Sequence, residues 1–245
     1  MLNLSAEEFK HIRQKIQIVF QDPHSSLNPA FTVFGSLQDP LKLYGVKTNA
    51  ERRKIIGDLL EAVNMRREQM DNYPHEFSGG QRQRICIARS LALNPELVIC
   101  DEPVSALDVS IQAQVINLLM DLQERLGLTY LFIAHDLSVV RHISTRVAVM
   151  YLGRIVEIAD RDTLFTAPKH PYTKALLNAV PEPDPEVGSL KSNQLIIGEV
   201  PSVRNPPAGC HFHPRCPQAM EICRTDTPEM TRIEGATVAC HLYPQ

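Results

Sequence analysis

Two adjacent carboxylates, Asp101 and Glu102, follow the short apolar run Leu97–Cys100. A strand that is buried on both faces has this composition, and open α/β sheets place their ligands at the carboxyl ends of such strands. At that position Asp101 could hold Mg²⁺ through a carboxylate oxygen, and Glu102 could orient or deprotonate a water molecule. An isolated Asp-Glu pair is more often a solvated strand end, so its meaning depends on the motifs around it.

A serine and two glycines, Ser78, Gly79 and Gly80, stand just before a helical pattern of apolar residues that runs through residues 85–92. The first N–H groups of a helix lack partners within the helix, and the positive end of its dipole faces outward. These residues could therefore bind an anion such as a phosphate group. On its own, a Ser-Gly-Gly sequence is usually a turn.

Taken together, these motifs resemble those of ABC transporter ATPases. Ser78–Gln81 is similar to the signature motif, Asp101–Glu102 to the Walker B motif and Ser105–Asp108 to the D-loop. Gln21 resembles the Q-loop glutamine, and His135, directly after an apolar run, resembles the switch histidine. Five elements in the family's order make this match specific.

The resemblance implies that two ATPase subunits lie head to tail with ATP and Mg²⁺ between them. Glu102, His135 and Gln21 would be the catalytic residues, and Asp101 and Gln21 would lie at the Mg²⁺ ion. The nucleotide would also contact Asp101 and, from the other subunit, Ser78, Gly79, Gly80, Gln81 and Asp108. Binding of ATP would close the pair of subunits and hydrolysis would release it.

The fold implied by the resemblance is an α/β fold of the P-loop NTPase (ABC ATPase) type with an inserted helical subdomain. Residues 1–21 would end the N-terminal catalytic part, and residues 22–76 would form the helical subdomain. Residues 77–165 would be the catalytic core, and residues 166–245 a C-terminal extension rich in cysteine and proline. Apolar stripes predict the helices of the subdomain, one with Val33, Leu37, Leu41 and Leu43, the other with Ile55, Ile56, Leu59, Leu60 and Val63.

Local patterns predict the remaining elements. Ser5–Glu8 has the spacing of a capping box and predicts a short helix, and Ile16–Phe20 predicts a strand. Asp108 and Gly127 are suited to begin and end a long amphipathic helix. A buried strand is predicted over Thr129–Ala134, a hairpin around Gly153 over Val147–Leu152 and Arg154–Ile158, and a short helix opened by proline over His170–Leu177.

The composition is that of an ordinary globular protein, with 44% hydrophobic and 22% charged residues. The net charge of -3 gives no reason to expect nucleic acid as a partner. No apolar run reaches the roughly 18 residues that a membrane-spanning helix needs, and the first residues lack the pattern of a signal peptide. We therefore expect a cytosolic chain that reaches a membrane only through partners.

The segments Met150–Gly153 and His170–Leu177 resemble the oligopeptide/dipeptide importer branch of the family. This resemblance implies an ATPase that energises peptide import from the cytoplasmic face of the cytoplasmic membrane. Its partners would be a second, related ATPase subunit, two transmembrane permease subunits and, indirectly, a solute-binding protein. The identity of the solute would depend on those other subunits.

Four cysteines, Cys210, Cys216, Cys223 and Cys240, lie in a tail rich in proline and histidine. Because cytosolic thiols stay reduced, four thiolates favour a tetrahedral Zn²⁺ or a [4Fe–4S] cluster over disulfides. The C-x-x-C spacing typical of zinc is absent, and similar tails in the importer branch are associated with an iron–sulfur cluster. We expect a structural cluster, with zinc as the alternative, whereas Cys86 and Cys100 are predicted to be core residues.

No glycine of the chain is followed by lysine, so the chain contains no Walker A motif, G-x-x-x-x-G-K-[ST]. We expect a chain truncated at its N-terminus, missing the N-terminal strands of the fold, poorly folded and inactive as an ATPase by itself. Two other classes stay open. One is a non-catalytic module that supplies the signature motif to a partner's ATP, and the other is a soluble ABC-type ATPase of DNA repair or translation.

Overall fold

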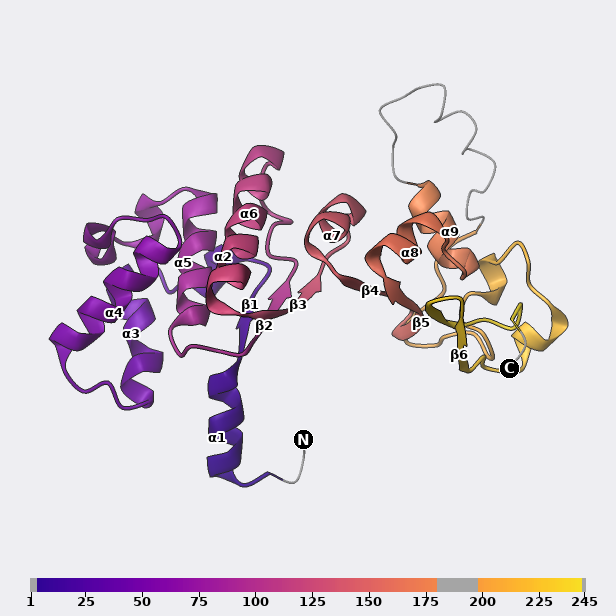
Figure 1. Cartoon of the computed structure of the whole chain (residues 1–245), viewed down its shortest axis with the longest axis horizontal. Coiled ribbons are helices and arrows are strands. Elements are labelled where there is room, and N and C mark those ends of the chain that lie inside the picture. The colour runs from indigo at the N-terminus through magenta and orange to yellow at the C-terminus, as the bar shows by residue number, and fades with distance from the viewer. Residues whose placement is uncertain (1–3, 180–197, 244–245) are drawn as a thin grey trace. The chain divides into compact units, whose positions relative to one another are not determined.

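The computed structural model describes residues 4–179 and 198–243 of the chain (Figure 1). Residues 180–197 of the predicted C-terminal extension lie outside the described residues. The chain divides into two compact units, Met1–Val139 and Val140–Gln245. Helix α7 (Leu137–Ile143) contains the boundary between them.

The first unit is built on a parallel sheet with the strand order β1-β2-β3. The strands are β1 (Ile16–Val19), β2 (Leu97–Asp101) and β3 (Thr129–Ile133). Helices α5 (Gly79–Leu91) and α6 (Val109–Leu126) lie on one side of this sheet (Figure 1). Because all three strands are parallel, their carboxyl ends meet at one edge, where Gln21, Glu102 and His135 follow them.

Only one face of the parallel sheet is well buried. Val19, Val98 and Cys100 are 1% exposed or less. Residues of the other face are much more accessible, with Ile18 37% and Leu131 52% exposed. The prediction that the strands are buried on both faces is therefore wrong for the described part of the chain, because the helices cover a single face.

The connection between β1 and β2 is largely helical, as predicted. It contains α2 (Pro23–Ser26), α3 (Val33–Leu43), α4 (Asn49–Ala62), η1 (Arg67–Asp71) and η2 (Pro74–Glu76). The predicted stripes are buried at Val33, Leu37, Leu41, Ile56, Leu60 and Val63. Leu43 was predicted to belong to the first stripe but is 65% exposed. Two residues past Leu41, it lies on the opposite side of α3.

The helix ends follow the predicted capping chemistry. Ser5 opens α1 (Ala6–Lys15) with a reciprocal capping box that involves Glu8. The Asp108 carboxylate accepts a hydrogen bond from the Ile111 N–H at the start of α6, and Gly127 ends that helix with a φ of 64°. These three predictions are confirmed. They could be made from the sequence because each cap depends only on residues within one or two turns of the helix end.

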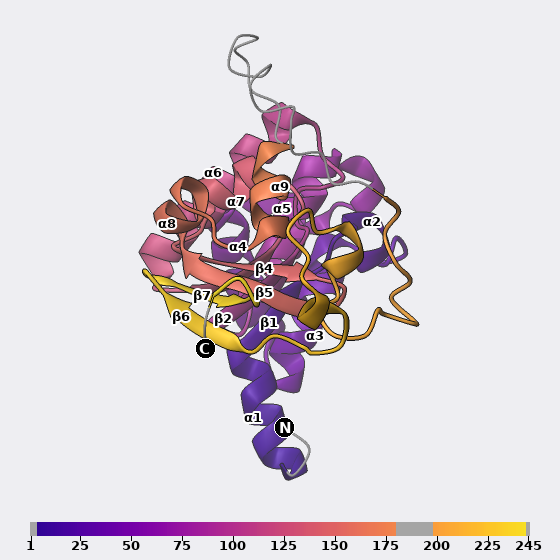
Figure 2. The same cartoon turned by 90° about the vertical axis from the view of Figure 1, so that its right-hand side faces the viewer.

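The second unit contains an antiparallel sheet with the order β4-β5-β7-β6. The predicted hairpin is confirmed as β4 (Arg146–Tyr151) and β5 (Arg154–Asp160). Strand β7 (Ala236–Ala239) pairs with β5, and β6 (Met230–Ile233) pairs with β7 (Figure 2). Helices α8 (Arg161–Thr166) and α9 (Pro171–Asn178) follow, then the short turns η4 (His213–Arg215) and η5 (Glu221–Arg224). Strands β6 and β7 were not predicted.

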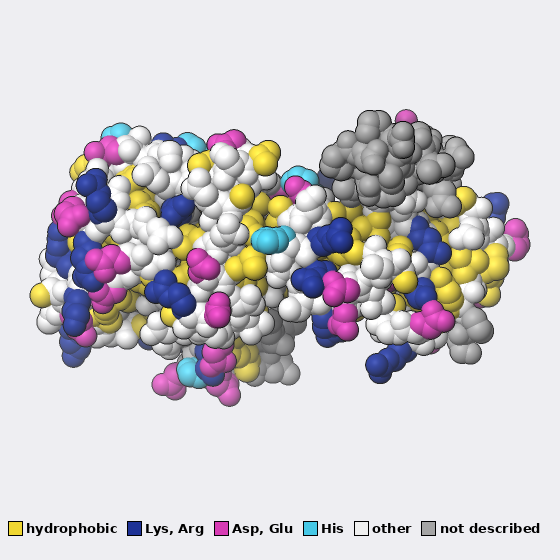
Figure 3. Space-filling model, turned by 45° about the horizontal axis from the view of Figure 1, so that its top comes forward, with side chains coloured by type: hydrophobic (Ala, Val, Ile, Leu, Met, Phe, Trp, Pro, Cys, Tyr) yellow, Lys and Arg dark blue, Asp and Glu magenta, His cyan; other side chains and the backbone are white. Residues whose placement is uncertain are grey.

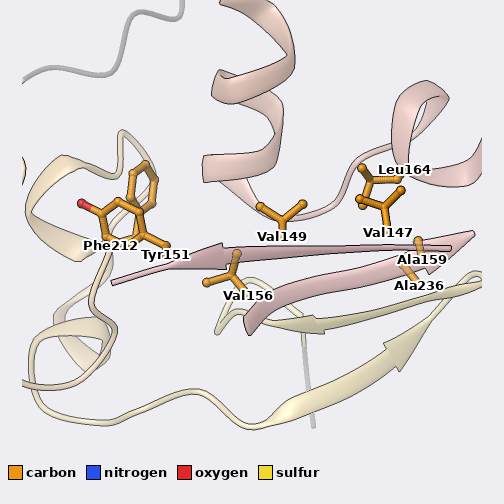
Figure 4. Packing of buried hydrophobic residues seen from close by; sticks show 8 residues of the cluster. All are labelled: Val147, Val149, Tyr151, Val156, Ala159, Leu164, Phe212 and Ala236. Atoms are coloured by element: carbon orange, nitrogen blue, oxygen red, sulfur yellow. The ribbon is translucent and has the colours of Figure 1, made fainter. Parts of the chain in front are cut away.

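The core of the second unit joins the hairpin to the cysteine-containing tail. The Phe212 ring, 1% exposed, packs edge-on against Tyr151 with ring centroids 5.2 Å apart. Figure 4 shows the cluster, which consists of Val147, Val149, Tyr151, Val156, Ala159, Leu164, Phe212 and Ala236. The tail is thus an integral part of this unit, because its aromatic anchor fills the hairpin's core.

On the face drawn in Figure 3, Lys and Arg side chains alternate with Asp and Glu side chains, in line with the net charge of -3. Within the described ranges, none of the helices has the length and apolar character needed to cross a bilayer.

The backbone of Glu102 is strained. Its φ of 44° lies in the left-handed region, which costs a residue with a Cβ atom about 1–2 kcal/mol. The conformation is held by hydrogen bonds on both sides of the residue. The Glu102 N–H donates to the Ile133 carbonyl at 3.0 Å, and the Glu102 carbonyl accepts from the Ser105 N–H at 3.2 Å. Such strain persists where the surrounding structure imposes it, often at functional sites.

We expect Glu102→Gly to be more stable than Glu102→Ala, by about 1 kcal/mol in the free energy of unfolding. Both variants lack the carboxylate, so their difference isolates the backbone strain. Denaturant titration of each variant measures it. At the exposed helical position Asn117 the order should be reversed, with Ala more stable than Gly by a similar amount. Equal or greater stability of Glu102→Ala would contradict the assigned strain.

Candidate functional site

The parallel sheet brings three predicted site residues together at its carboxyl edge. The Gln21 amide nitrogen, Nε2, donates a hydrogen bond to Oε2 of Glu102 at 3.0 Å. His135 Nδ1 lies 3.2 Å from the same oxygen. Gln21 follows β1, Glu102 follows β2 and His135 follows β3, so three strands each contribute one side chain to a single contact.

This contact is open to solvent on one side. The His135 side chain is 71% exposed, whereas that of Glu102 is 27% exposed. Asp101 ends β2, paired with Ile133 of β3, and is half-buried. A carboxylate that is fixed by two neighbours and still reachable from solvent can accept a proton from a positioned water molecule. The carboxylate and amide oxygens here are also the kind of ligand that Mg²⁺ prefers.

The signature-like residues form the N-terminus of α5, as predicted. The Ser78 hydroxyl accepts from the Gln81 N–H at 3.3 Å, and the Gln81 side-chain oxygen accepts from the Ser78 N–H at 3.0 Å. Ser78 itself is exposed. Gly80 packs so closely on α6 that an added Cβ would lie 2.4 Å from Cγ2 of Ile111. Glycine is therefore required at this position for α5 and α6 to approach each other.

The D-loop-like residues lead directly into α6. Asp108 Oδ1 accepts from the Ser110 hydroxyl at 2.7 Å and from the Ile111 N–H at 3.0 Å, and these bonds hold the pKa of Asp108 below its usual value. Gln112 Nε2 donates to the carbonyls of Val104 and Leu107, which ties the loop to the helix. Asp108 is exposed at the start of α6.

The predicted residues therefore fall into two groups. Gln21, Glu102 and His135 meet directly, whereas Ser78 and Asp108 cap two adjacent helices. Among the described residues, no hydrogen bond joins either capping residue to the three that meet at the sheet edge.

Two contacts between α5 and α2 were not predicted from the sequence. Arg82 contacts His24, which follows Gln21 closely in the chain, and Arg89 donates a hydrogen bond to the Ser26 carbonyl. The two arginines are seven residues apart in α5, a spacing that places them on the same face of a helix. That spacing was the available signal, but the sequence does not reveal which segment this face meets.

The histidine that precedes α9 has a structural role. His170 is 1% exposed, and its ring accepts a hydrogen bond from the Tyr172 N–H at 3.0 Å. Burial lowers the pKa of His170 to about 4, so the ring is neutral near pH 7. The buried carboxylate of Glu157 accepts from the N–H groups of Lys169 and His170. The start of the predicted helix His170–Leu177 is thus fixed to β5 through Glu157.

The four late cysteines share one neighbourhood. The Cys210 N–H donates to the Cys223 carbonyl at 2.9 Å. Burial, together with the nearby thiols of Cys210, Cys216 and Cys223, raises the pKa of the Cys240 thiol to about 11. In the part of the chain that is described, however, no three His, Cys, Asp or Glu side chains stand in position to hold a metal ion. As arranged in this structure, the thiols do not form a ligand set.

The predicted core cysteines are confirmed. Cys86 is 2% exposed in α5 and Cys100 is 0% exposed in β2. Burial raises the pKa of Cys86 to about 11 and that of Cys100 to about 12, so both stay protonated near pH 7.

Comparisons with known proteins show which family the chain resembles. Residues 2–105 match the ABC transporter family model, and residues 156–223 match the oligopeptide/dipeptide transporter C-terminal region. The chain is 54% identical over 244 residues to the oligopeptide transport ATP-binding protein AppF of Bacillus subtilis, covering 98% of this chain and 74% of AppF. The putative oligopeptide transport ATP-binding protein YkfD of the same organism is 53% identical over 242 residues, with 98% and 74% coverage.

A solved structure shares the fold. The ATP-binding cassette MJ0796, in a dimeric post-hydrolysis state bound to ADP and Pi, superposes with a TM-score of 0.56 at 31% identity. The match covers 65% of this chain and 68% of that one. With the P-loop NTPase fold and the branch-specific C-terminal region both matched, the chain belongs to the ATP-hydrolysing subunits of ABC transporters, in the oligopeptide/dipeptide importer branch.

Proposed function

We propose that this protein powers the import of di- or oligopeptides by hydrolysing ATP at the carboxyl edge of its parallel sheet. The observation that supports the proposal most directly is the double contact on Glu102 Oε2, from Gln21 at 3.0 Å and from His135 at 3.2 Å. The peptide substrate is inferred from the relatives, which are named as oligopeptide transport ATP-binding proteins.

Each side chain at the edge has a defined task in this proposal. Glu102 accepts a proton from the attacking water, and Gln21 and His135 hold its carboxylate in place. Asp101 and the side-chain oxygen of Gln21 would hold Mg²⁺. When bound, that ion neutralises charge on the phosphates. His135, which is largely exposed, is free to hydrogen-bond a phosphate oxygen.

A second subunit completes the site. The exposed Ser78 and the N–H groups of the first turn of α5 form an anion-binding helix terminus that has no hydrogen bond to its own Glu102 among the described residues. In a head-to-tail pair, Ser78, Gly79, Gly80, Gln81 and Asp108 would contact the nucleotide held by the other subunit. The solved MJ0796 cassette is likewise a dimer, with ADP and Pi bound.

The helical segment, residues 22–76, is proposed to contact the permease subunits. A solvent-open hollow beside it is lined by Phe20, Ser25, Ser26, Pro40 and Arg89 together with Gln17, Ile18 and Ser90. Phe20 is 48% exposed there. A hollow that contains an exposed aromatic ring is suited to receive a short helix from a partner. Residues 77–165 then act as the catalytic core and 166–245 as the extension, peripheral to the cytoplasmic face of the membrane.

The 245-residue chain is proposed to lack ATP turnover by itself, because it contains no Walker A lysine. It spans 74% of the length of AppF and YkfD. A second candidate follows from the same observation. With an exposed Ser78 and no Walker A motif, the chain could act as a non-catalytic module that supplies its signature turn to a partner's ATP.

In a form of the protein that also carries a Walker A motif, we expect Glu102→Gln to lower the ATP turnover of the assembled transporter at least about 100-fold, while ATP binding persists. The variant loses the proton acceptor but keeps the shape of the side chain. Peptide-stimulated phosphate release from proteoliposomes that contain the permeases and a related ATPase subunit measures this. Glu124→Gln, an exposed change on α6, serves as the control and should leave turnover unchanged. Unchanged turnover in Glu102→Gln would contradict the catalytic role. Transport that needs this chain but not Glu102 would support the non-catalytic module.

The four late cysteines are proposed to hold a structural [4Fe–4S] cluster once their side chains rearrange, with Zn²⁺ as the alternative. Their shared neighbourhood supports a common ligand, although the described positions do not yet form one. Anaerobically purified protein should contain about four iron and four acid-labile sulfide per chain. Cys216→Ser should lower both contents, whereas Cys86→Ala should not. One equivalent of zinc without iron would rule the cluster out.

A further inference from the structure

We infer that two arginines of α5, Arg82 and Arg89, connect the two nucleotide-contacting parts of one subunit, the Q-loop glutamine and the signature turn. They tie the Q-loop segment, residues 21–26, to the helix that Ser78 caps. The inference rests on the proposed function, in which Gln21 serves one ATP and Ser78 serves the ATP of the other subunit. A mechanical link between them would make each site sensitive to the state of its neighbour.

The Q-loop segment is rigid enough to carry such a link. The Asp22 carboxylate accepts hydrogen bonds from the N–H groups of His24 at 2.8 Å and Ser25 at 3.3 Å. The Ser26 hydroxyl donates to the Asp22 carbonyl at 2.7 Å. Pro23 is buried and fixes φ at the first position of α2. A displacement of Gln21 therefore moves this whole short turn rather than one side chain.

Arg82 is the first attachment. Its Nη1 lies 3.0 Å from Nδ1 and 2.7 Å from Nε2 of His24, so the guanidinium contacts the imidazole ring. Its Nε donates to the Pro74 carbonyl at 2.7 Å, and its backbone N–H donates to the Ser78 carbonyl at 2.9 Å. One residue thus contacts the Q-loop segment, the turn that leads into the signature and the cap residue itself.

Arg89 is the second attachment. Its guanidinium donates a hydrogen bond to the Ser26 carbonyl, two helical turns along α5 from Arg82. Both arginines are half-buried, and the hydrogen bonds from Arg82 to the Pro74 carbonyl and from Arg89 to the Ser26 carbonyl are partly shielded from water. Two attachments at opposite ends of α2 prevent it from pivoting on α5. The segment and the helix are therefore expected to shift together when Gln21 gains or loses its bond to Glu102.

This arrangement defines a physical route between the sites. Gln21 is hydrogen-bonded to the Glu102 carboxylate at the sheet edge, so a displacement of that carboxylate displaces Gln21 and then α2. The contacts of His24 and Ser26 transmit this displacement to Arg82 and Arg89 of α5. The end point is the hydroxyl of Ser78 and the first N–H groups of α5. Coupling of this kind is measurable as a change at one end caused by a substitution at the other.

Amide hydrogen exchange of the whole, nucleotide-free chain tests the inference. Gln21→Ala removes the bond to Glu102, and it should raise the exchange rates of the Gly80 and Gln81 amides at least about fivefold. In a chain that also carries His24→Ala and Arg89→Met, Gln21→Ala should change those rates by less than about twofold. The matched control, His11→Ala with Arg154→Met, alters an exposed histidine and an exposed arginine elsewhere and should preserve the fivefold effect.

Two results would overturn the inference. One is that Gln21→Ala leaves the Gly80 and Gln81 amides unchanged in the parent chain, and the other is that the effect is equally large without the two attachments. Protected amides in β2 show that a variant is folded. If the first pair of substitutions unfolds the chain, Arg89→Leu with His24→Leu repeats the comparison, because neither side chain can make the hydrogen bonds. Because no nucleotide is present, the result is independent of ATP turnover, so failure of the proposed function would be recognised separately.

Discussion

The parallel pairing of β1, β2 and β3 is the constraint on which the candidate site depends. It aligns Ile18 with Ile99 and Ile99 with Leu131, so the three strands end at the same level. The residues that follow them then have little freedom to be elsewhere. A shift of one strand by a single residue would move its side chains to the other face and separate Gln21 or His135 from Glu102.

The backbone strain of the site lies at the same edge of the sheet. Glu102 adopts a left-handed backbone, and the Ile133 carbonyl of the adjacent strand holds it there. The sheet therefore supplies both the position of the carboxylate and the restraint that keeps it strained. Helices α5 and α6 stabilise this arrangement from one face, through the close approach of Gly80 to Ile111. Stability and function are thus linked through one sheet and the two helices beside it.

Local chemistry made much of the chain predictable from sequence. The caps at Ser5 and Asp108, the stop at Gly127 and the hairpin around Gly153 depend on a few neighbouring residues, and all were confirmed. Features that depend on distant partners were not predicted. Strand β7 pairs with β5 across a long separation in sequence, and the contact between Arg82 and His24 joins residues 58 positions apart. The prediction that the strands are buried on both faces was wrong. Burial depends on which helices cover a sheet, and the hydrophobic periodicity of a strand does not reveal this.

The candidate site requires that Gln21 and Glu102 act as a connected pair in the folded protein. A double-mutant cycle with Gln21→Ala and Glu102→Ala, followed by denaturant unfolding of all four proteins, isolates their interaction. The hydrogen bond of 3.0 Å predicts a coupling free energy of about 1 kcal/mol. Additive effects, with a coupling below about 0.3 kcal/mol, would show that the two side chains are independent and that the pair does not exist.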